Sequence, residues 1–180
     1  MIVSDISLPA LMKAKELITM HQFDHRAEFV HADGLNSLQT PVQAISLMGM
    51  GGDTMCDILH SGLDKLQGAT LILSPHTEIH KVRKVLPRIG YAIMEEVIAR
   101  SAGRFYVILK AMPGQAEYTE KELLLGPCLM RERPVHYTQY LLWRQSVAQK
   151  ALKALNEADK NNCAAGEWQR LHLYIEEELQ

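Results

Sequence analysis

Two aspartates, Asp5 and Asp33, each follow a short apolar stretch that we expect to form a strand. A carboxylate where a strand gives way to a helix can accept hydrogen bonds from both hydroxyls of a ribose. Local turn or capping chemistry is the other interpretation of Asp5. Asp33 precedes Gly34, and its carboxylate could accept from an adenine amino group, although Asp-Gly is also a common turn dipeptide.

A glycine-rich corner, formed by Gly49, Gly51 and Gly52, interrupts the apolar run from residue 43 to 59. Glycine tolerates positive φ and lets a ligand come close, and ligands of open α/β sheets bind outside the carboxyl ends of the strands. The glycines could instead only shape a strand-to-helix turn. Because both aspartates and the corner follow successive strands, together they indicate a crevice shaped for a nucleoside.

The segment Ser74-Pro75-His76 ends the next strand and should face the same crevice. His76 could accept a proton or stack on a base, or it could be ordinary polar surface. His76 and His80 have i, i+4 spacing, but no third ligand or His-Glu-x-x-His pattern accompanies them. We therefore predict no metal. The sequence also contains no Walker loop, no nucleophile elbow and no dinucleotide-binding fingerprint.

Strands and helices are predicted to alternate through the first half of the chain, with strands at 2–6, 27–31, 43–48 and 70–73. Short joints between them favour a parallel, doubly wound α/β sheet. Ile45, Leu47 and Met48 are so uniformly apolar that both faces of their strand should be covered. Residues 79–89 read as a basic amphipathic helix bearing Lys81, Arg83, Lys84 and Arg88. An antiparallel hairpin, 91–99 with 104–111, should complete a mixed sheet.

From Pro134 onward, apolar residues recur at three- and four-residue spacing in two stretches, which predicts two helices packed as an antiparallel pair. A single helix with a disordered tail is the alternative. We predict a domain boundary between 1–132 and 133–180. Basic and aromatic residues near this junction could bind RNA, or could form a solvated helix face with its aromatics in the core; they are Arg131, Arg133, Arg144, Lys150, Lys153, Tyr137, Tyr140 and Trp143.

Composition describes an ordinary globular protein of 180 residues with a net charge of −2 and 47% hydrophobic content. Its three cysteines are far apart, which favours reduced thiols over a disulfide framework or a zinc site. The N-terminus has no signal-peptide pattern, and no apolar run reaches the roughly 18 residues of a membrane span. We therefore predict a cytoplasmic protein that does not enter a membrane.

The chain resembles the bacterial tRNA (adenine-N1)-methyltransferases that modify adenine 22 of tRNA (TrmK-like enzymes). The resemblance covers nearly the whole chain. Its most specific feature is the combination of Gly49-Met50-Gly51-Gly52 with the segment 122–127. The matching segments are Val3-Ser4-Asp5-Ile6, Asp33-Gly34-Leu35, Gly49-Met50-Gly51-Gly52, Leu71-Ile72-Leu73-Ser74-Pro75 and Glu122-Leu123-Leu124-Leu125-Gly126-Pro127.

This resemblance implies a Rossmann-like class I methyltransferase fold, S-adenosyl-L-methionine as cofactor, tRNA as partner and a C-terminal coiled-coil domain. Asp5 and Ile6 would hold the donor ribose, Asp33 and Gly34 its adenine, and Met48 and Gly49 the end of the donor pocket. The substrate base would meet two segments, Met50-Gly51-Gly52 and Ser74-Pro75-His76. Methyl transfer to a ring nitrogen needs in-line alignment, so positioning supplies most of the catalysis.

Two departures from the family pattern affect these expectations. Ser74-Pro75-His76 stands where the family has Gln-Pro-Asn. The family's first strand and donor loop, with the acidic residue proposed as catalytic, correspond to positions before Met1, so we expect a truncated sheet without its first strand, weak donor binding and poor methylation. The alternative is a non-catalytic RNA-binding or dimerising protein; the oligomeric state stays open, a dimer included. A third possibility, a Rossmann-like domain that binds another nucleotide, loses support because the sequence has no dinucleotide-binding fingerprint.

Overall fold

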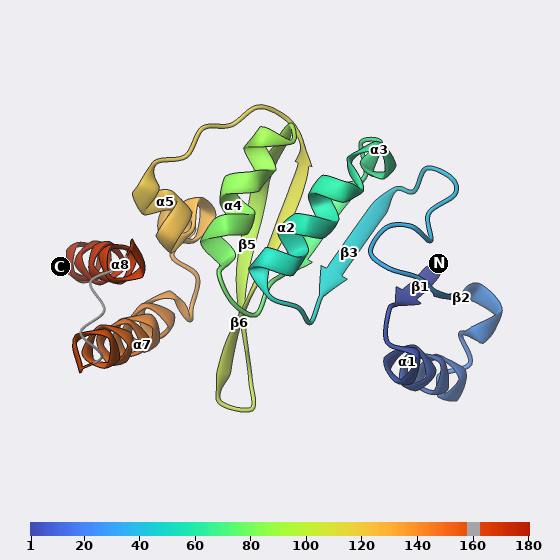
Figure 1. Ribbon diagram of the computed structural model, residues 1–180, viewed down its shortest axis with the longest axis horizontal. Coiled ribbons are helices and arrows are strands. Elements are labelled where there is room, and N and C mark those ends of the chain that lie inside the picture. Colours follow the sequence, from blue (N-terminus) through green and yellow to red (C-terminus); the bar gives the residue numbers. More distant parts are fainter. Residues whose placement is uncertain (158–162) are drawn as a thin grey trace.

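The computed structural model describes residues 1–157 and 163–180, and it alternates strands with helices in the first half of the chain (Figure 1). The elements are β1 (Ile2–Asp5), α1 (Leu8–Met20), a 3-10 turn (Asp24–Arg26), β2 (Glu28–His31), β3 (Ala44–Met48), α2 (Gly52–Ser61), α3 (Leu63–Leu66), β4 (Thr70–Ser74), α4 (Ile79–Arg88), β5 (Tyr91–Ser101), β6 (Arg104–Pro113), α5 (Glu120–Leu125), α6 (Pro127–Glu132), α7 (Tyr137–Glu157) and α8 (Cys163–Leu179).

The strands form two sheets instead of one. β1 pairs with β2 in parallel, and a separate four-stranded sheet has the order β3-β4-β6-β5. Its β3–β4 ladder is parallel, whereas β4–β6 and β5–β6 are antiparallel. The prediction of a mixed sheet ending in a hairpin is confirmed, but the parallel part is smaller than expected, because no ladder joins β1 to β3 within the described residues.

Helices α2 and α4 lie on one face of the four-stranded sheet (Figure 1). This face contains the core, in which Ile45 and Leu47 of β3 and Leu71 and Leu73 of β4 are buried. The other face of β3 is open, since its residues alternate between exposed and buried and Met48 is 50% exposed. The expectation that both faces of this strand are covered is therefore wrong for this chain.

The N-terminal unit, β1-α1-β2, is joined to the larger sheet by a loop and not by strand pairing. Ser7 caps α1 by accepting from the backbone N–H of Ala10. Only Leu11 of this helix is buried, while Leu8 and Leu17 are more than half exposed. A two-stranded sheet is too narrow to cover a 13-residue helix, which explains this exposure.

The loop after β2 packs on α2. A Cβ at Gly34 would lie 3.4 Å from Ile58 Cγ1, and one at Gly62 would lie 2.7 Å from Leu35 Cδ1. Gly62, which also ends α2, therefore has to be small for Leu35 to enter the core. This packing ties the segment that follows Asp33 to the helix that follows the glycine corner.

Helix α4 contains a buried arginine. Arg83, expected on the solvated basic face, is fully buried together with Glu96 of β5, and Arg83 Nη2 lies 2.8 Å from Glu96 Oε1. The sequence pattern misassigned it because the α5–α6 segment covers that side of the helix. Pro87 lies inside the last turn and does not end α4, which continues to Arg88.

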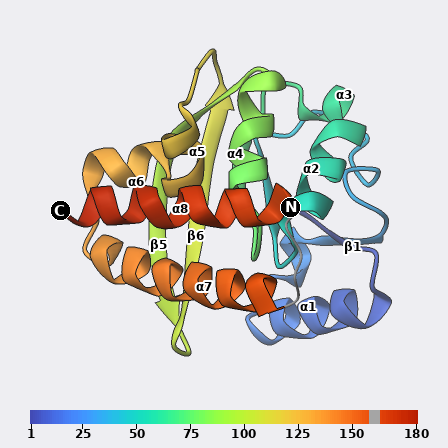
Figure 2. The same ribbon diagram turned by 60° about the vertical axis from the view of Figure 1, so that its left-hand side comes forward.

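Helices α7 and α8 lie side by side, and in Figure 2 they cross in front of strands β5 and β6. They are tied to the rest of the chain by charged contacts: Arg133 Nη2 to Glu178 Oε1 at 2.7 Å, and Lys121 Nζ to Glu177 Oε2 at 3.0 Å. The connection between them lies largely outside the described residues. None of the helices in the described part of the chain is long and apolar enough to cross a membrane.

Candidate functional site

Two loops meet at the carboxyl ends of β3 and β4. Met48 and Ser74, the last residues of these strands, are paired in register. Beyond them, His76 N donates to Met50 O (2.8 Å) and Gly52 N donates to Thr77 O (3.0 Å). A Cβ at position 52 would lie 2.6 Å from Glu78 O, so only glycine allows the loops to come this close.

The other corner glycines have different surroundings. Gly49 has φ +79°, and a Cβ there would meet no atom within 4 Å, so the end of β3 borders open space. Gly51 faces the Thr77 side chain, with a Cβ-to-Oγ1 distance of 3.1 Å. The corner thus serves both purposes considered for it: Gly52 shapes a turn, and Gly49 leaves room for a ligand.

Asp5 takes part in the turn that begins α1, because its Oδ1 accepts from the backbone N–H of Ser7 at 2.7 Å. Ile6 is exposed, and its carbonyl oxygen is hydrogen-bonded to His31 Nε2 at 2.9 Å. Asp33 is exposed, its carbonyl accepts from Asn36 N, and Gly34 has φ +53°. The local turn roles considered for both aspartates therefore occur, and each side chain remains accessible.

The two groups of candidate residues lie on separate sheets. Asp5 and Asp33 follow β1 and β2, whereas the glycine corner and Ser74-Pro75-His76 follow β3 and β4. Links between them include the packing of Gly34 against Ile58 and of Leu35 against Gly62, both on the side of α2. A pocket that used both groups would therefore be bordered by two sheets that are not paired with each other in the described part of the chain.

Charged side chains surround the start of α4. Lys81 Nζ lies 2.8 Å from Asp53 Oδ1 and 2.7 Å from Glu78 Oε1. The hydrogen bond from Lys81 lowers the pKa of Asp53, and the bonds to both carboxylates raise the pKa of Lys81. The lysine thus offsets part of the negative charge that borders the glycine corner, and all three side chains are partly exposed.

A cleft of about 680 Å³ lies between the sheet and the C-terminal helices, on the side of segment 75–81 away from the glycine corner. We call it the aromatic cleft and define it by Pro75, His76, Phe105, Trp143, Arg144 and Trp168. The ring centroids of Phe105 and Trp143 are 5.7 Å apart, and the His76 ring meets Tyr106 edge-on at 5.8 Å. His76 is thus a ring at the boundary of this cleft.

His80 joins the cleft wall to α8 through Glu167, with Nε2 and Oε1 3.0 Å apart. Burial lowers the pKa of His80, opposed by the charge of Glu167 and assisted by Arg144 and Lys81. Within the described chain, no three His, Cys, Asp or Glu side chains cluster as metal ligands would.

The depressed pKa of His80 predicts a pH dependence of folding. Because the pKa of His80 is lower in the folded state, the unfolded state takes up the proton first as the pH falls. The contribution of neutral His80 to stability is therefore fully present above the ordinary pKa of 6.5 and is lost as the pH falls through the folded pKa. We expect the unfolding free energy of the wild type, relative to that of His80→Gln, to decrease over this range, as measured by urea unfolding at several pH values.

The basic residues near the helical pair are largely engaged within the protein. Arg131 Nη2 is paired with Glu132, Arg133 with Glu178, and Arg144 Nη1 donates to the Leu124 carbonyl. Tyr137 and Tyr140 are buried, as in the core interpretation, and burial raises the pKa of Tyr137. Trp143, by contrast, is 41% exposed and available for stacking.

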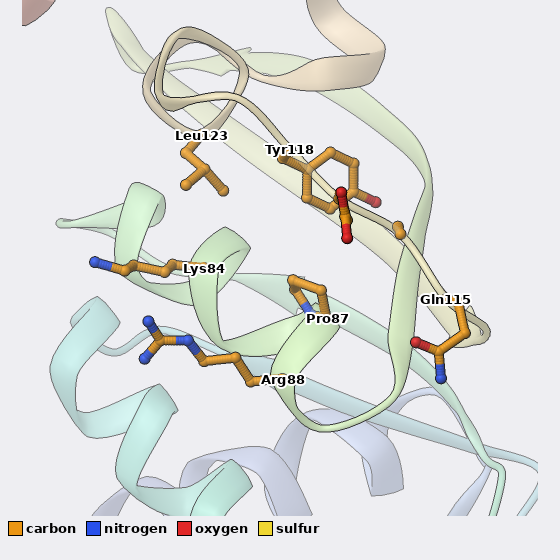
Figure 3. Close-up of a pocket in the computed structure, with 8 residues that line it drawn as sticks. Lys84, Pro87, Arg88, Gln115, Tyr118 and Leu123 are labelled. Carbon is orange, nitrogen blue, oxygen red and sulfur yellow. The ribbon is translucent and has the colours of Figure 1, made fainter.

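A second hollow, of about 750 Å³, lies along the last turns of α4 (Figure 3). Lys84, Pro87 and Arg88 line it from the helix, and Tyr118 and Leu123 line it from the opposite side. The Tyr118 hydroxyl accepts from the backbone N–H of Ile93 at 2.8 Å. This hollow is at the far end of α4 from the Pro75–His76 loop and is separate from the candidate site.

Sequence reasoning missed Phe105 and Trp168 as site residues. Phe105 lies on β6 and Trp168 on α8, and neither is part of a local motif. A usable signal existed, because the chain has only two tryptophans, Trp143 and Trp168, in two neighbouring amphipathic stretches. Only the packing of α7 and α8 brings them to one cleft.

Comparison with known proteins identifies relatives over almost the whole chain. A family model described as tRNA (adenine(22)-N(1))-methyltransferase matches residues 1–176. The tRNA (adenine(22)-N(1))-methyltransferase of Bacillus subtilis strain 168 is 28% identical in an alignment of 165 residues that covers 85% of this chain and 69% of that protein.

Solved structures agree with this result. A Streptococcus agalactiae protein of the NADB-Rossmann superfamily has a TM-score of 0.85 at 24% identity, covering 99% of this chain and 79% of the other, and it establishes the Rossmann-like fold. A Streptococcus pneumoniae protein solved with S-adenosyl-L-methionine has a TM-score of 0.82 at 28% identity, covering 99% and 80%.

Proposed function

The chain belongs to the tRNA (adenine(22)-N(1))-methyltransferase family, and on this premise we propose that it transfers a methyl group from S-adenosyl-L-methionine to N1 of adenine 22 in tRNA. The observation that carries the proposal is the junction of the β3–α2 and β4–α4 loops, where Gly49 borders open space at the end of a strand. When bound, S-adenosyl-L-methionine supplies an electrophilic methyl group on a sulfonium.

We assign the donor to the first set of candidate residues. The Asp5 carboxylate would accept from the ribose hydroxyls beside Ile6, and Asp33 with Gly34 would frame the donor adenine. Gly49 suits the reacting end because no side chain fills the space beside it, with Met48 at the strand end. Asp5 still has a second carboxylate oxygen for a ligand besides the one that accepts from Ser7.

We assign the target base to the two loops that meet there. Met50-Gly51-Gly52 and Ser74-Pro75-His76 are joined by the bond from His76 N to Met50 O, and Gly52 N is bonded to the next residue, Thr77, so the two loops would present a single rigid surface to the base. Such rigidity matters because an in-line displacement gains its rate from alignment.

We propose that α7 and α8 form a second domain, 133–180, as a coiled-coil-like pair that supports the tRNA. Its packing on the catalytic unit through Lys121 and His80 would give the tRNA a fixed orientation. The reaction would take place in the cytoplasm, where tRNA is found.

A methylation assay tests the proposal. The chain is incubated with labelled donor and unmodified tRNA, and N1-methyladenosine is quantified after nuclease digestion. The matched control is the same tRNA with guanosine at position 22, which should incorporate no label. A gel shift with tRNA, run in parallel, distinguishes the alternative, because tRNA binding without transfer would favour the non-catalytic RNA-binding protein.

Donor affinity should be low for the 180 residues alone. Asp5 and Gly49 lie on two sheets that share no ladder in the described structure, so ordering the pocket would consume part of the binding free energy. In calorimetry we expect that micromolar donor, which would saturate a tight site, does not saturate this chain. Tight, stoichiometric binding would show that the absence of a ladder between the two described sheets has no effect on the pocket.

A further inference from the structure

Apart from Pro75 and His76, the residues of the aromatic cleft have no role in the proposed reaction. Its lining residues all lie at or after position 75, so it contains none of the residues assigned to the donor. We propose that it binds an unstacked nucleobase of the tRNA that neighbours the methylated adenine in the RNA chain. The inference rests on the proposed function, whose substrate it specifies further.

The cleft offers aromatic surface in a suitable arrangement. Trp143 is stacked on Tyr140 with centroids 6.0 Å apart and planes at 30°, while its other contact, Phe105, is tilted by 46°. Tyr140 is buried and holds the indole in place, whereas Trp143 remains 41% exposed. Single-stranded RNA is recognised through bases stacked on such side chains, and this stacking tolerates any base.

The charged groups at the cleft are already partnered, which favours a neutral base over a phosphate. Lys81 is held by Asp53 and Glu78, and His80 faces Glu167 at 3.0 Å. Arg144 donates to the Leu124 carbonyl while its guanidinium lies 5.8 Å from the Tyr140 ring centroid. The surface left for a ligand is therefore mainly the aromatic rings.

The cleft is next to the position proposed for the target base. The 75–78 loop contacts Gly51 and Gly52 through Thr77 and Glu78, and the same loop forms part of the cleft wall. His76 connects the two sides, since its backbone N–H is bonded to Met50 O and the residue also lines the cleft. A strand of RNA that places one base at the glycine corner would bring the adjacent base to this wall.

Tryptophan fluorescence provides a direct test, because both tryptophans of the chain line the cleft. The chain is titrated with unmodified tRNA and, separately, with a single-stranded RNA hexamer, in the absence of methyl donor. We expect both probes to quench the emission. Since no donor is present, a failure of methyl transfer would not alter this result, so the two proposals can fail independently.

Trp143→Ala should weaken tRNA binding about 5- to 100-fold, the range for losing one base–aromatic stack, while Trp143→Phe should keep most of the affinity. Leu142→Ala is the matched control, because Leu142 is 51% exposed on the same helix and does not line the cleft. Circular dichroism establishes that each variant is folded.

Three outcomes would overturn the inference. They are tRNA binding without quenching, equal affinity for Trp143→Ala and Leu142→Ala, and no quenching by either RNA probe. A fluorescence change that depends on protein concentration without RNA would instead indicate that a second protein chain fills the cleft, and it would also count against a nucleobase.

Discussion

Replacing Arg83 by methionine is expected to lower the free energy of unfolding by about 3–5 kcal/mol, the usual cost of removing one partner of a buried ion pair. Arg83 and Glu96 are both fully buried, and Arg83 Nε donates to Glu96 Oε1 at 2.8 Å. Methionine is similar in length but leaves the Glu96 carboxylate without a counter-charge. Urea unfolding followed by circular dichroism measures the loss.

The pair also fixes the break between α5 and α6, which raises the expected cost. Arg83 Nη1 donates to the carbonyls of Leu123 and Leu124 at the end of α5, at 3.0 and 3.2 Å. Glu96 Oε2 accepts from Cys128 N at 2.9 Å, at the start of α6. Each charge therefore has the sign that the adjoining helix end favours.

Two further variants make the test specific. Lys84→Met removes an exposed lysine from the next position of the same helix and should change the unfolding free energy by less than about 0.5 kcal/mol. Arg83→Met combined with Glu96→Gln keeps an acceptor for Cys128 N but removes both charges, so it should be more stable than Arg83→Met alone. Equal losses for Arg83→Met and Lys84→Met would refute the role of the pair.

The sequence predicted the elements better than their assembly. The hairpin was found because strand patterns are local. The burial of Arg83 was missed since its partner, Glu96, lies on another element, and helical periodicity alone cannot show which element covers a given face.

The candidate site shows the same limit. The position of Gly49 at the end of β3 followed from the apolar run before it, and the structure agrees. The open face of β3 depends on which elements pack against it. The separation of β1 from β3 depends on which strands pair. Composition encodes neither. The aromatic cleft combines residues from positions 75 to 168, so only tertiary packing defines it.

Gly52→Ala is expected to destabilise the protein by about 2–4 kcal/mol and to reduce methyl transfer. The new Cβ would lie 2.6 Å from Glu78 O and 2.8 Å from Thr77 O, both backbone atoms that cannot rotate away. Overpacking costs about 1–3 kcal/mol, and weakening the hydrogen bond from Gly52 N to Thr77 O adds about 0.5–1.5 kcal/mol. Urea unfolding gives the loss, and the methylation assay gives the effect on the site.

Gly51→Ala is the matched control one position earlier. Its Cβ would face Thr77 Oγ1 at 3.1 Å, an atom that a side-chain rotation can move, and Gly51 has φ −72°, which alanine adopts without strain. Alanine is a poorer helix N-cap than glycine, but it also restricts the unfolded chain, so the two effects offset each other. If Gly51→Ala and Gly52→Ala were equally stable and equally active, the close approach of the two loops would not be what determines the geometry of the site.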